Sequence, residues 1–140
     1  MKYIYISLIV TVLFTTCKTG KLDGPERVIR FGNGGGITGK VTGFKISSLG
    51  TLYAETLNNT TSPLKMKLRK KTLQEIFDLA DSIQKNVPDF SNPGNMYYFI
   101  SFGNNAETPN YTWGQNEFTV PSSIKRLYDI LQKIAIKSTK

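Results

Sequence analysis

The pattern of apolar and polar residues along this chain predicts a sheet built mostly from hairpins. Short runs of β-branched and aromatic residues alternate with clusters of glycine, asparagine and proline, which is typical of strands joined by turns. Residues 64–69 alternate strictly between apolar and basic, so we expect this strand to have one buried and one solvent-exposed face. The predicted strands are residues 26–32, 37–47, 51–56, 64–69, 95–103 and 111–114, with 117–120 as a continuation of the last.

Two further segments repeat apolar residues at intervals of three and four, which is the period of an amphipathic helix. Thr72 and Glu75 have the spacing of a capping box, so the first helix is expected to open there and run to about Asn86. The second helix is expected to open at residues 121–123, Pro-Ser-Ser, where either serine would serve as its cap.

The predicted order of elements is βββ(β)–α–ββ–α. Links of hairpin length make the strands mainly antiparallel, and two amphipathic helices need one face of the sheet to cover. We therefore predict an α+β fold, with a mainly antiparallel sheet of about five or six strands and two helices packed on one face. A domain of about 115 residues can build such a core without a metal or a disulfide.

The N-terminus has the form of an export signal. Met1-Lys2 gives a positive start, residues 3–14 form an apolar run, and small residues precede Cys17. The twelve apolar-run residues fall well below the roughly 20 that span a bilayer as a helix. A buried N-terminal strand or helix is the alternative, but the run has no amphipathic period and ends abruptly in polar residues.

Cys17 is the only cysteine, so an intrachain disulfide is impossible. Its position directly after the apolar run resembles the lipobox of bacterial lipoproteins. In that family the signal is cut just before the cysteine, which then carries the lipid that holds the protein to a membrane. The resemblance implies a signal peptide over residues 1–16 and a lipidated Cys17. Residues 18–24 are polar with two glycines, so residues 17–24 are predicted as the lipidated cysteine with a flexible tether. Pro25 then marks the start of a single globular domain over 25–140.

The side chains available for catalysis are few. The chain has no histidine, which removes the commonest general base and the commonest metal ligand. With the one thiol assigned to lipid, Cys/His zinc sites and Ser/His or Cys/His catalysis are excluded. Glu75, Asp78 and Asp81 lie three residues apart but off the apolar stripe, so they indicate a solvated face. We therefore predict no enzyme, no metal and no cofactor.

The chain carries a formal net charge of +8, with one dense basic run over residues 65–71. An exported protein rarely meets nucleic acid, so solubility or attraction to anionic lipid headgroups explains this charge better. A plainer interpretation of this basic run is that it forms the solvent-exposed face of a strand and the start of a helix. Lysines on such a strand also discourage pairing with the edge of another sheet. The candidate contacts with an anionic surface are Lys65, Lys67, Arg69 and Lys70.

Five of the twelve glycines fall within residues 31–39. Glycine adopts positive φ readily and lets another backbone approach, so we predict a turn or bulge that bends the sheet between the first two strands. The stretch also fits two phosphate-binding patterns, but both need a helix directly afterwards and a β-branched strand follows here. We expect no nucleotide. The candidate interaction surface is Asn33, Gly34, Gly35 and Gly36, together with Trp113 near a strand end.

The combined motifs resemble a family of small lipoproteins of the Bacteroidetes. The motifs are the glycine stretch from Phe31 to Gly39, residues 93–95 (Pro-Gly-Asn) before an aromatic strand, residues 112–114 (Thr-Trp-Gly) and a final helix. The resemblance implies a lipid-anchored protein of the bacterial cell envelope. In those bacteria acidic residues after the lipid cysteine direct lipoproteins to the cell surface. Lys18-Thr19-Gly20 lacks them, so we expect the outer membrane, facing the periplasm.

More distantly, the order of motifs is similar to emfourin, a small protein inhibitor of thermolysin-like metalloproteases. The corresponding turn here is Gly35-Gly36-Ile37-Thr38-Gly39, with Ile37 in place of an aromatic residue. This resemblance implies a binding module and carries over no inhibitory residue.

We therefore predict a membrane-anchored, non-enzymatic protein-binding module whose partner is an envelope or secreted protein, such as a metalloprotease. One alternative is a structural or membrane-surface lipoprotein that contacts anionic lipid through a basic face. The other is an enzyme, which would need a deep pocket with converging polar groups. No nucleic acid is expected as a partner.

Overall fold

The computed structural model describes residues 25–55, 61–103 and 109–139. The predicted signal peptide, Cys17, the tether and most of the predicted loop over residues 104–110 lie outside them. The helices are α1 (Lys70–Asn86) and α2 (Ser122–Ser138). The strands are β1 (Val28–Gly35), β2 (Thr42–Ser47), β3 (Thr51–Glu55), β4 (Thr61–Lys67), β5 (Phe90–Asn92), β6 (Met96–Phe102) and β7 (Tyr111–Trp113).

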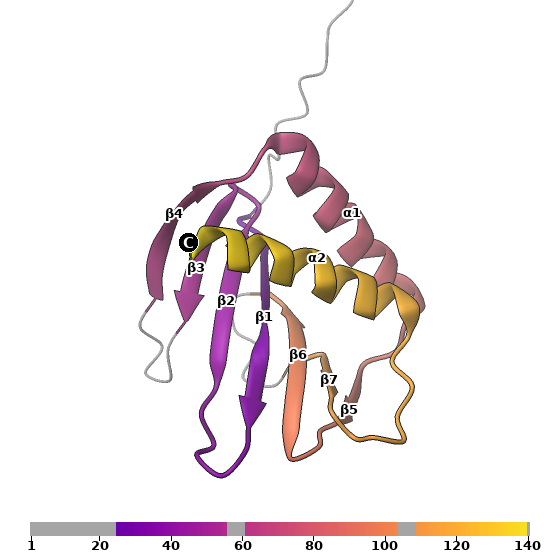
Figure 1. The fold of residues 1–140 in the computed structure, drawn as a ribbon. Coiled ribbons are helices and arrows are strands. Elements are labelled where there is room, and N and C mark those ends of the chain that lie inside the picture. Colours follow the sequence, from indigo (N-terminus) through magenta and orange to yellow (C-terminus); the bar gives the residue numbers. More distant parts are fainter. Residues whose placement is uncertain (1–24, 56–60, 104–108, 140) are drawn as a thin grey trace, which may run out of the picture.

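The strands form one sheet in the order β4-β3-β2-β1-β6-β7-β5 (Figure 1). Neighbouring strands are antiparallel except for β5 and β7, which are parallel. The helix α2 crosses one face of the sheet, and α1 packs beside it near the end where β4 leads into α1 (Figure 1). The predicted α+β class is confirmed, although the sheet has seven strands in its described part rather than five or six.

A single core lies between the helices and one face of the sheet. Its sheet side includes Ile29, Phe31, Ile46, Leu52 and Ile100, each at most 1% exposed. Burial of such a side chain contributes about 1.5–3 kcal/mol. The helices add the apolar stripes that their periodicity predicted, in which Tyr128 of α2 is half-buried. The other stripe residues are buried: Leu73, Ile76, Phe77, Ala80 and Ile83 from α1, with Ile124, Leu127, Leu131, Ile134 and Ala135 from α2.

The glycine stretch is divided between a strand and a turn. β1 runs on to Gly35, and β2 begins only at Thr42, so the predicted boundaries at residues 32 and 37 were wrong. On the face opposite the helices, a Cβ on Gly32 would lie 3.0 Å from the Phe99 ring, and a Cβ on Gly34 would lie 2.7 Å from the Tyr97 ring. The strand glycines therefore make room for aromatic rings that reach across from β6.

Both predicted helix caps are wrong. α1 begins at Lys70, two residues before Thr72, and its N-cap Arg69 makes no side-chain capping bond. α2 has Pro121 as its N-cap, again without a side-chain bond. The Leu73 N–H donates to the Arg69 oxygen at 3.1 Å, so the first turn of α1 already contains Thr72 and leaves it no place as the cap.

The secondary structure of two short segments differs from the prediction. Residues 117–120 form no strand, whereas residues 90–92, expected as a loop, form β5 beside β7. The Phe90 ring explains why residues 90–92 form a strand, since its centroid lies 5.3 Å from that of Tyr111 and 4.8 Å from that of Phe118. Packing of Phe90 on the inner face draws its backbone into pairing with β7.

Candidate functional site

Asn33, Tyr98 and Trp113 form a row across the sheet, at the end where β1 finishes and β6 begins. Asn33 is opposite Tyr98, and Tyr98 is opposite Trp113. Residues directly opposite in a ladder point to the same face, here the one that carries the helices. The structure therefore brings together two of the predicted contact residues, Asn33 and Trp113, with Tyr98 between them.

Tyr128 of α2 completes an aromatic cluster with Tyr98 and Trp113. The ring centroids are 5.9 Å apart for Tyr98 and Trp113, 5.6 Å for Tyr98 and Tyr128, and 5.1 Å for Trp113 and Tyr128. The contacts are tilted or edge-on, which is the arrangement that aromatic quadrupoles prefer. The three rings hold one another in place and form a preorganised surface.

The Tyr128 hydroxyl group ties α2 to the sheet. It donates to the Gly32 carbonyl oxygen at 3.1 Å and accepts from Gln132 Nε2 at 2.7 Å. Burial raises the pKa of Tyr128 to about 12, partly opposed by the Gln132 hydrogen bond. The hydroxyl group therefore stays neutral at ordinary pH and acts in positioning, because a phenol with this pKa is a poor general base.

Beside the cluster lies a cavity of about 580 Å³, which we call the aromatic groove. This volume falls within the range of about 300–1,000 Å³ that is usual for ligand pockets. Lys125 and Asp129 are exposed at its border, one helical turn apart on α2. The groove is lined by Tyr98, Trp113, Phe118, Thr119, Val120, Lys125, Tyr128 and Asp129.

The β1–β2 turn lies at the same end of the sheet. It is held by hydrogen bonds from the Gly36 N–H to the Asn95 oxygen at 2.7 Å and from the Gly39 N–H to the Gly36 oxygen at 3.1 Å. Ile37 within this turn is fully exposed, and Met96, opposite Gly35 on β6, is 50% exposed. We call Ile37, Met96, Tyr98, Trp113 and the aromatic groove together the apolar end.

Sequence reasoning identified this site in part. Asn33 and Gly35 lie in β1 rather than in a loop, and Gly34 is buried beneath the Tyr97 ring. Gly36 opens the turn and is half-buried. Neither Tyr98 nor Tyr128 was among the predicted contact residues, so the groove was missed. The presence of tyrosine at positions of an apolar pattern could have indicated the groove. A hydroxyl group at such a position needs a polar partner or contact with solvent.

The predicted basic contacts lie at the opposite end of the sheet (Figure 1). Lys67 ends β4, Arg69 precedes α1, and Lys70 begins it, and all three side chains are exposed. The Lys65 side chain lies outside the described part. The basic residues and the candidate interaction surface therefore belong to different ends of the molecule.

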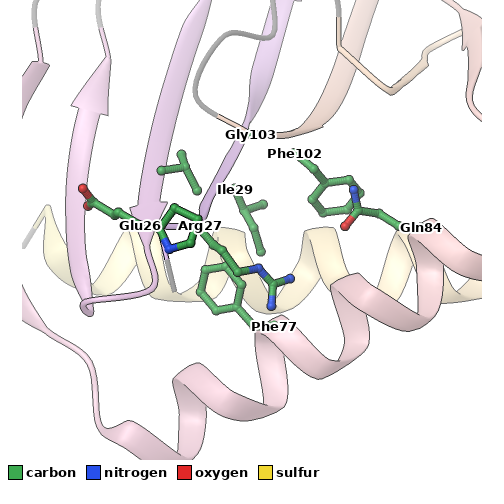
Figure 2. Close-up of a pocket in the computed structure, with 9 residues that line it drawn as sticks. Glu26, Arg27, Ile29, Phe77, Gln84, Phe102 and Gly103 are labelled. Carbon is green, nitrogen blue, oxygen red and sulfur yellow. The ribbon is translucent and has the colours of Figure 1, made fainter. Parts of the chain in front are cut away.

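A smaller cavity of about 280 Å³ lies between the start of β1 and α1 (Figure 2). The Arg27 guanidinium group packs on the Phe77 ring at 5.0 Å and forms an ion pair with Asp81, with both of its terminal nitrogens donating. Ile29 and Phe102 supply much of the remaining wall. Because its arginine is already paired, this cavity offers little converging chemistry and serves to join α1 to the sheet.

Among the residues that the structure describes, no three metal-ligating side chains gather closely enough to hold an ion. Neither helix in the same ranges combines the length and apolarity needed to cross a bilayer. Glu75, Asp78 and Asp81 are exposed on α1, and Asp81 is the partner of Arg27.

Comparison with known proteins gives no family for this chain. No protein-family model matches it, and no curated protein matches it in sequence. The resemblances to lipoproteins and to emfourin therefore stay predictions, and the apolar end is the feature on which a function can be proposed.

Proposed function

We propose that this protein is a non-enzymatic module of the bacterial cell envelope that binds another protein through its apolar end and is anchored to a membrane by lipid on Cys17. The observation that carries the proposal is the exposure of Ile37, Met96 and Tyr98 at the same end of the sheet, where Tyr98 also lines the aromatic groove. Large apolar side chains gathered on one surface mark interaction sites, and tyrosine and tryptophan supply much of the energy at protein interfaces.

The rigidity of this surface supports protein binding. The turn around Ile37 is fixed by two backbone hydrogen bonds, and the groove is framed by three rings in mutual contact. A surface that is already ordered loses little conformational entropy when a partner docks on it. A protruding turn beside a groove also suits a protein better than a small molecule, which would use the groove alone.

The polar groups at the apolar end favour binding over catalysis. The Tyr128 hydroxyl group is engaged by Gly32 and Gln132, and its raised pKa keeps it protonated. Lys125 and Asp129 are exposed on the helix surface. Their exposure leaves them solvated, so they are better suited to orienting a partner than to proton transfer.

The test is a photo-reactive amino acid placed at single positions of the full chain in its native host. Positions 37 and 98 should trap the same protein, and position 85, an exposed lysine on α1, should trap none of it. Identical products at all three positions, or no product at position 37 or 98, would contradict the proposal.

A secreted metalloprotease is the partner class that the emfourin resemblance implies. Purified protein should then inhibit a thermolysin-like metalloprotease, and Ile37→Asp should weaken inhibition at least tenfold, because a charge in a desolvated contact is costly. If positions 37 and 98 trap a partner but no metalloprotease is inhibited, the module binds protein and the inhibitor hypothesis is wrong.

A further inference from the structure

The turn between β2 and β3 joins two parts of the chain that are far apart in sequence. The Ser48 N–H donates to the Arg27 oxygen at 2.8 Å, and the Arg27 N–H donates to Ser48 Oγ at 3.0 Å. The Leu68 N–H donates to the Gly50 oxygen at 3.1 Å. The place where the described chain begins and the place where β4 passes into α1 therefore lie at one end of the sheet. We call this the tether end.

The tether end combines an exposed apolar side chain with several cations. Leu49 within the turn is 64% exposed. Exposed basic residues follow on the strand–helix connection beside it, whereas Glu26 is the exposed acid next to the start of β1. The basic residues are Lys67, Arg69, Lys70 and Lys71, all of them exposed.

The cations at the start of α1 work against the stability of their own helix. The N-terminal end of a helix dipole is positive and disfavours cations. The described first turn of α1 nevertheless carries no acid, and Arg69 provides no capping bond. A local arrangement that opposes helix stability indicates a role outside the helix.

We infer that the tether end is a membrane-contact surface that binds anionic lipid headgroups. Its basic residues supply charge complementarity, and Leu49 supplies an apolar side chain for the interface. The short distance along the chain to Cys17 supports a membrane as the occupant, since Pro25 lies only eight positions after Cys17. That length holds Pro25 within about 30 Å of a lipid carried by Cys17, even when fully extended. This step rests on the lipid anchor of the proposed function.

This contact orients the whole domain. The turn between β2 and β3 and the turn between β1 and β2 lie at opposite ends of the sheet (Figure 1). With the tether end on the membrane, the apolar end faces away from it. Membrane contact and protein binding then use separate surfaces and do not compete.

The experiment places a fluorescent probe on Leu49→Cys in the full lipidated chain, purified from membranes and reconstituted in vesicles with a headgroup quencher. Ile37→Cys, also exposed but at the other end of the sheet, is the matched control. The parent chain takes the label only if Cys17 lacks lipid, so it tests the anchor separately. The Leu49 probe should be quenched in vesicles of phosphatidylcholine with phosphatidylglycerol. It should recover in neutral vesicles or high salt, while the Ile37 probe stays unquenched.

The charges are tested by combining Arg69→Gln, Lys70→Gln and Lys71→Gln. Each charge removed should weaken the attraction about fivefold, so most quenching at position 49 should disappear. Thermal stability should stay the same or rise, because these cations oppose the helix dipole. Equal quenching at positions 37 and 49, no quenching at position 49, or quenching unchanged by the three substitutions would overturn the inference.

Discussion

At the scale of single residues, Gly32 shows why the chain concentrates glycine in β1. The strand has two neighbours, and on the face away from the helices the Phe99 ring lies across it. A side chain at Gly32 would meet both the ring and the Thr42 carbonyl oxygen. The absence of a side chain therefore serves sheet packing here, rather than a turn.

Gly32→Ala should destabilise the protein by about 1–3 kcal/mol, since the backbone oxygen of Thr42 has little room to move. Gly39→Asn is the matched control, because Gly39 has φ of +58° with open space around it and asparagine tolerates this region. Urea unfolding of the purified proteins measures the difference. A Gly32→Ala variant as stable as the parent would contradict this account of β1.

The buried Tyr111 and the half-buried Tyr128 predict how stability responds to alkali. Burial raises the pKa of Tyr128 to about 12 and, with Asp89 nearby, also raises that of Tyr111. Both phenols must stay neutral in the folded state but ionise near pH 10 when unfolded. Their contribution is fully present below pH 10 and is lost as the pH rises toward 12.

Tyr128→Phe should therefore flatten part of the fall in stability between pH 10 and 12, while costing about 0.5–1.5 kcal/mol at neutral pH for the lost hydrogen bond to Gly32. Urea unfolding at pH 8 and pH 11 compares the two proteins. The same pH dependence in both would show that Tyr128 is not the responsible group.

At the scale of elements, the apolar periodicity of the helices predicted the structure better than the capping signals at their ends. The apolar stripes of both helices came directly from residue spacing, because helix burial depends on a repeat that sequence displays. The predicted caps were wrong, because neither helix begins with a side-chain capping bond. β5 was missed because three residues carry no period, and its pairing depends on where Phe90 packs.

The uncapped start of α1 gives a direct prediction. Arg69 has extended backbone at the N-cap position, with φ of −67° and ψ of 141°, but its side chain makes no capping bond. Arg69→Asp should supply that bond and a favourable charge, and so stabilise the protein by about 0.5–2 kcal/mol. Arg69→Ala, which adds neither, is the control in thermal unfolding. Equal stability of the two variants would contradict the role of the cap.

At the scale of the whole molecule, the two ends of the sheet carry different chemistry. The residues of both ends are visible in the sequence. Only the strand order joins the β1–β2 turn to the start of β6, and the β2–β3 turn to the connection that carries the basic residues. Strand order depends on long-range pairing that local patterns do not encode, so the groove and the separation of the two surfaces could not be predicted from the sequence.

This separation predicts that binding and stability respond differently at the apolar end. Ile37→Asp should leave stability within about 0.5 kcal/mol, because the side chain is fully exposed, yet weaken partner binding at least tenfold. Leu49→Asp, a matched change at the tether end, should leave partner binding unchanged. Calorimetric titration with the partner trapped at position 37 measures both effects, and equal losses in the two variants would contradict separate surfaces.

The central place of β1 also bears on how the chain folds. β1 pairs with the adjacent β2, but its other neighbour is β6, where Ile29 meets Phe102, 73 residues later in the sequence. The first four strands can pair locally as soon as they are available, whereas the β1–β6 ladder waits for most of the chain. Closing so long a loop is slow, and it leaves one side of β1 unpaired in the meantime. Because synthesis releases the N-terminal part of a chain first, that open strand is the region most in need of protection from other chains.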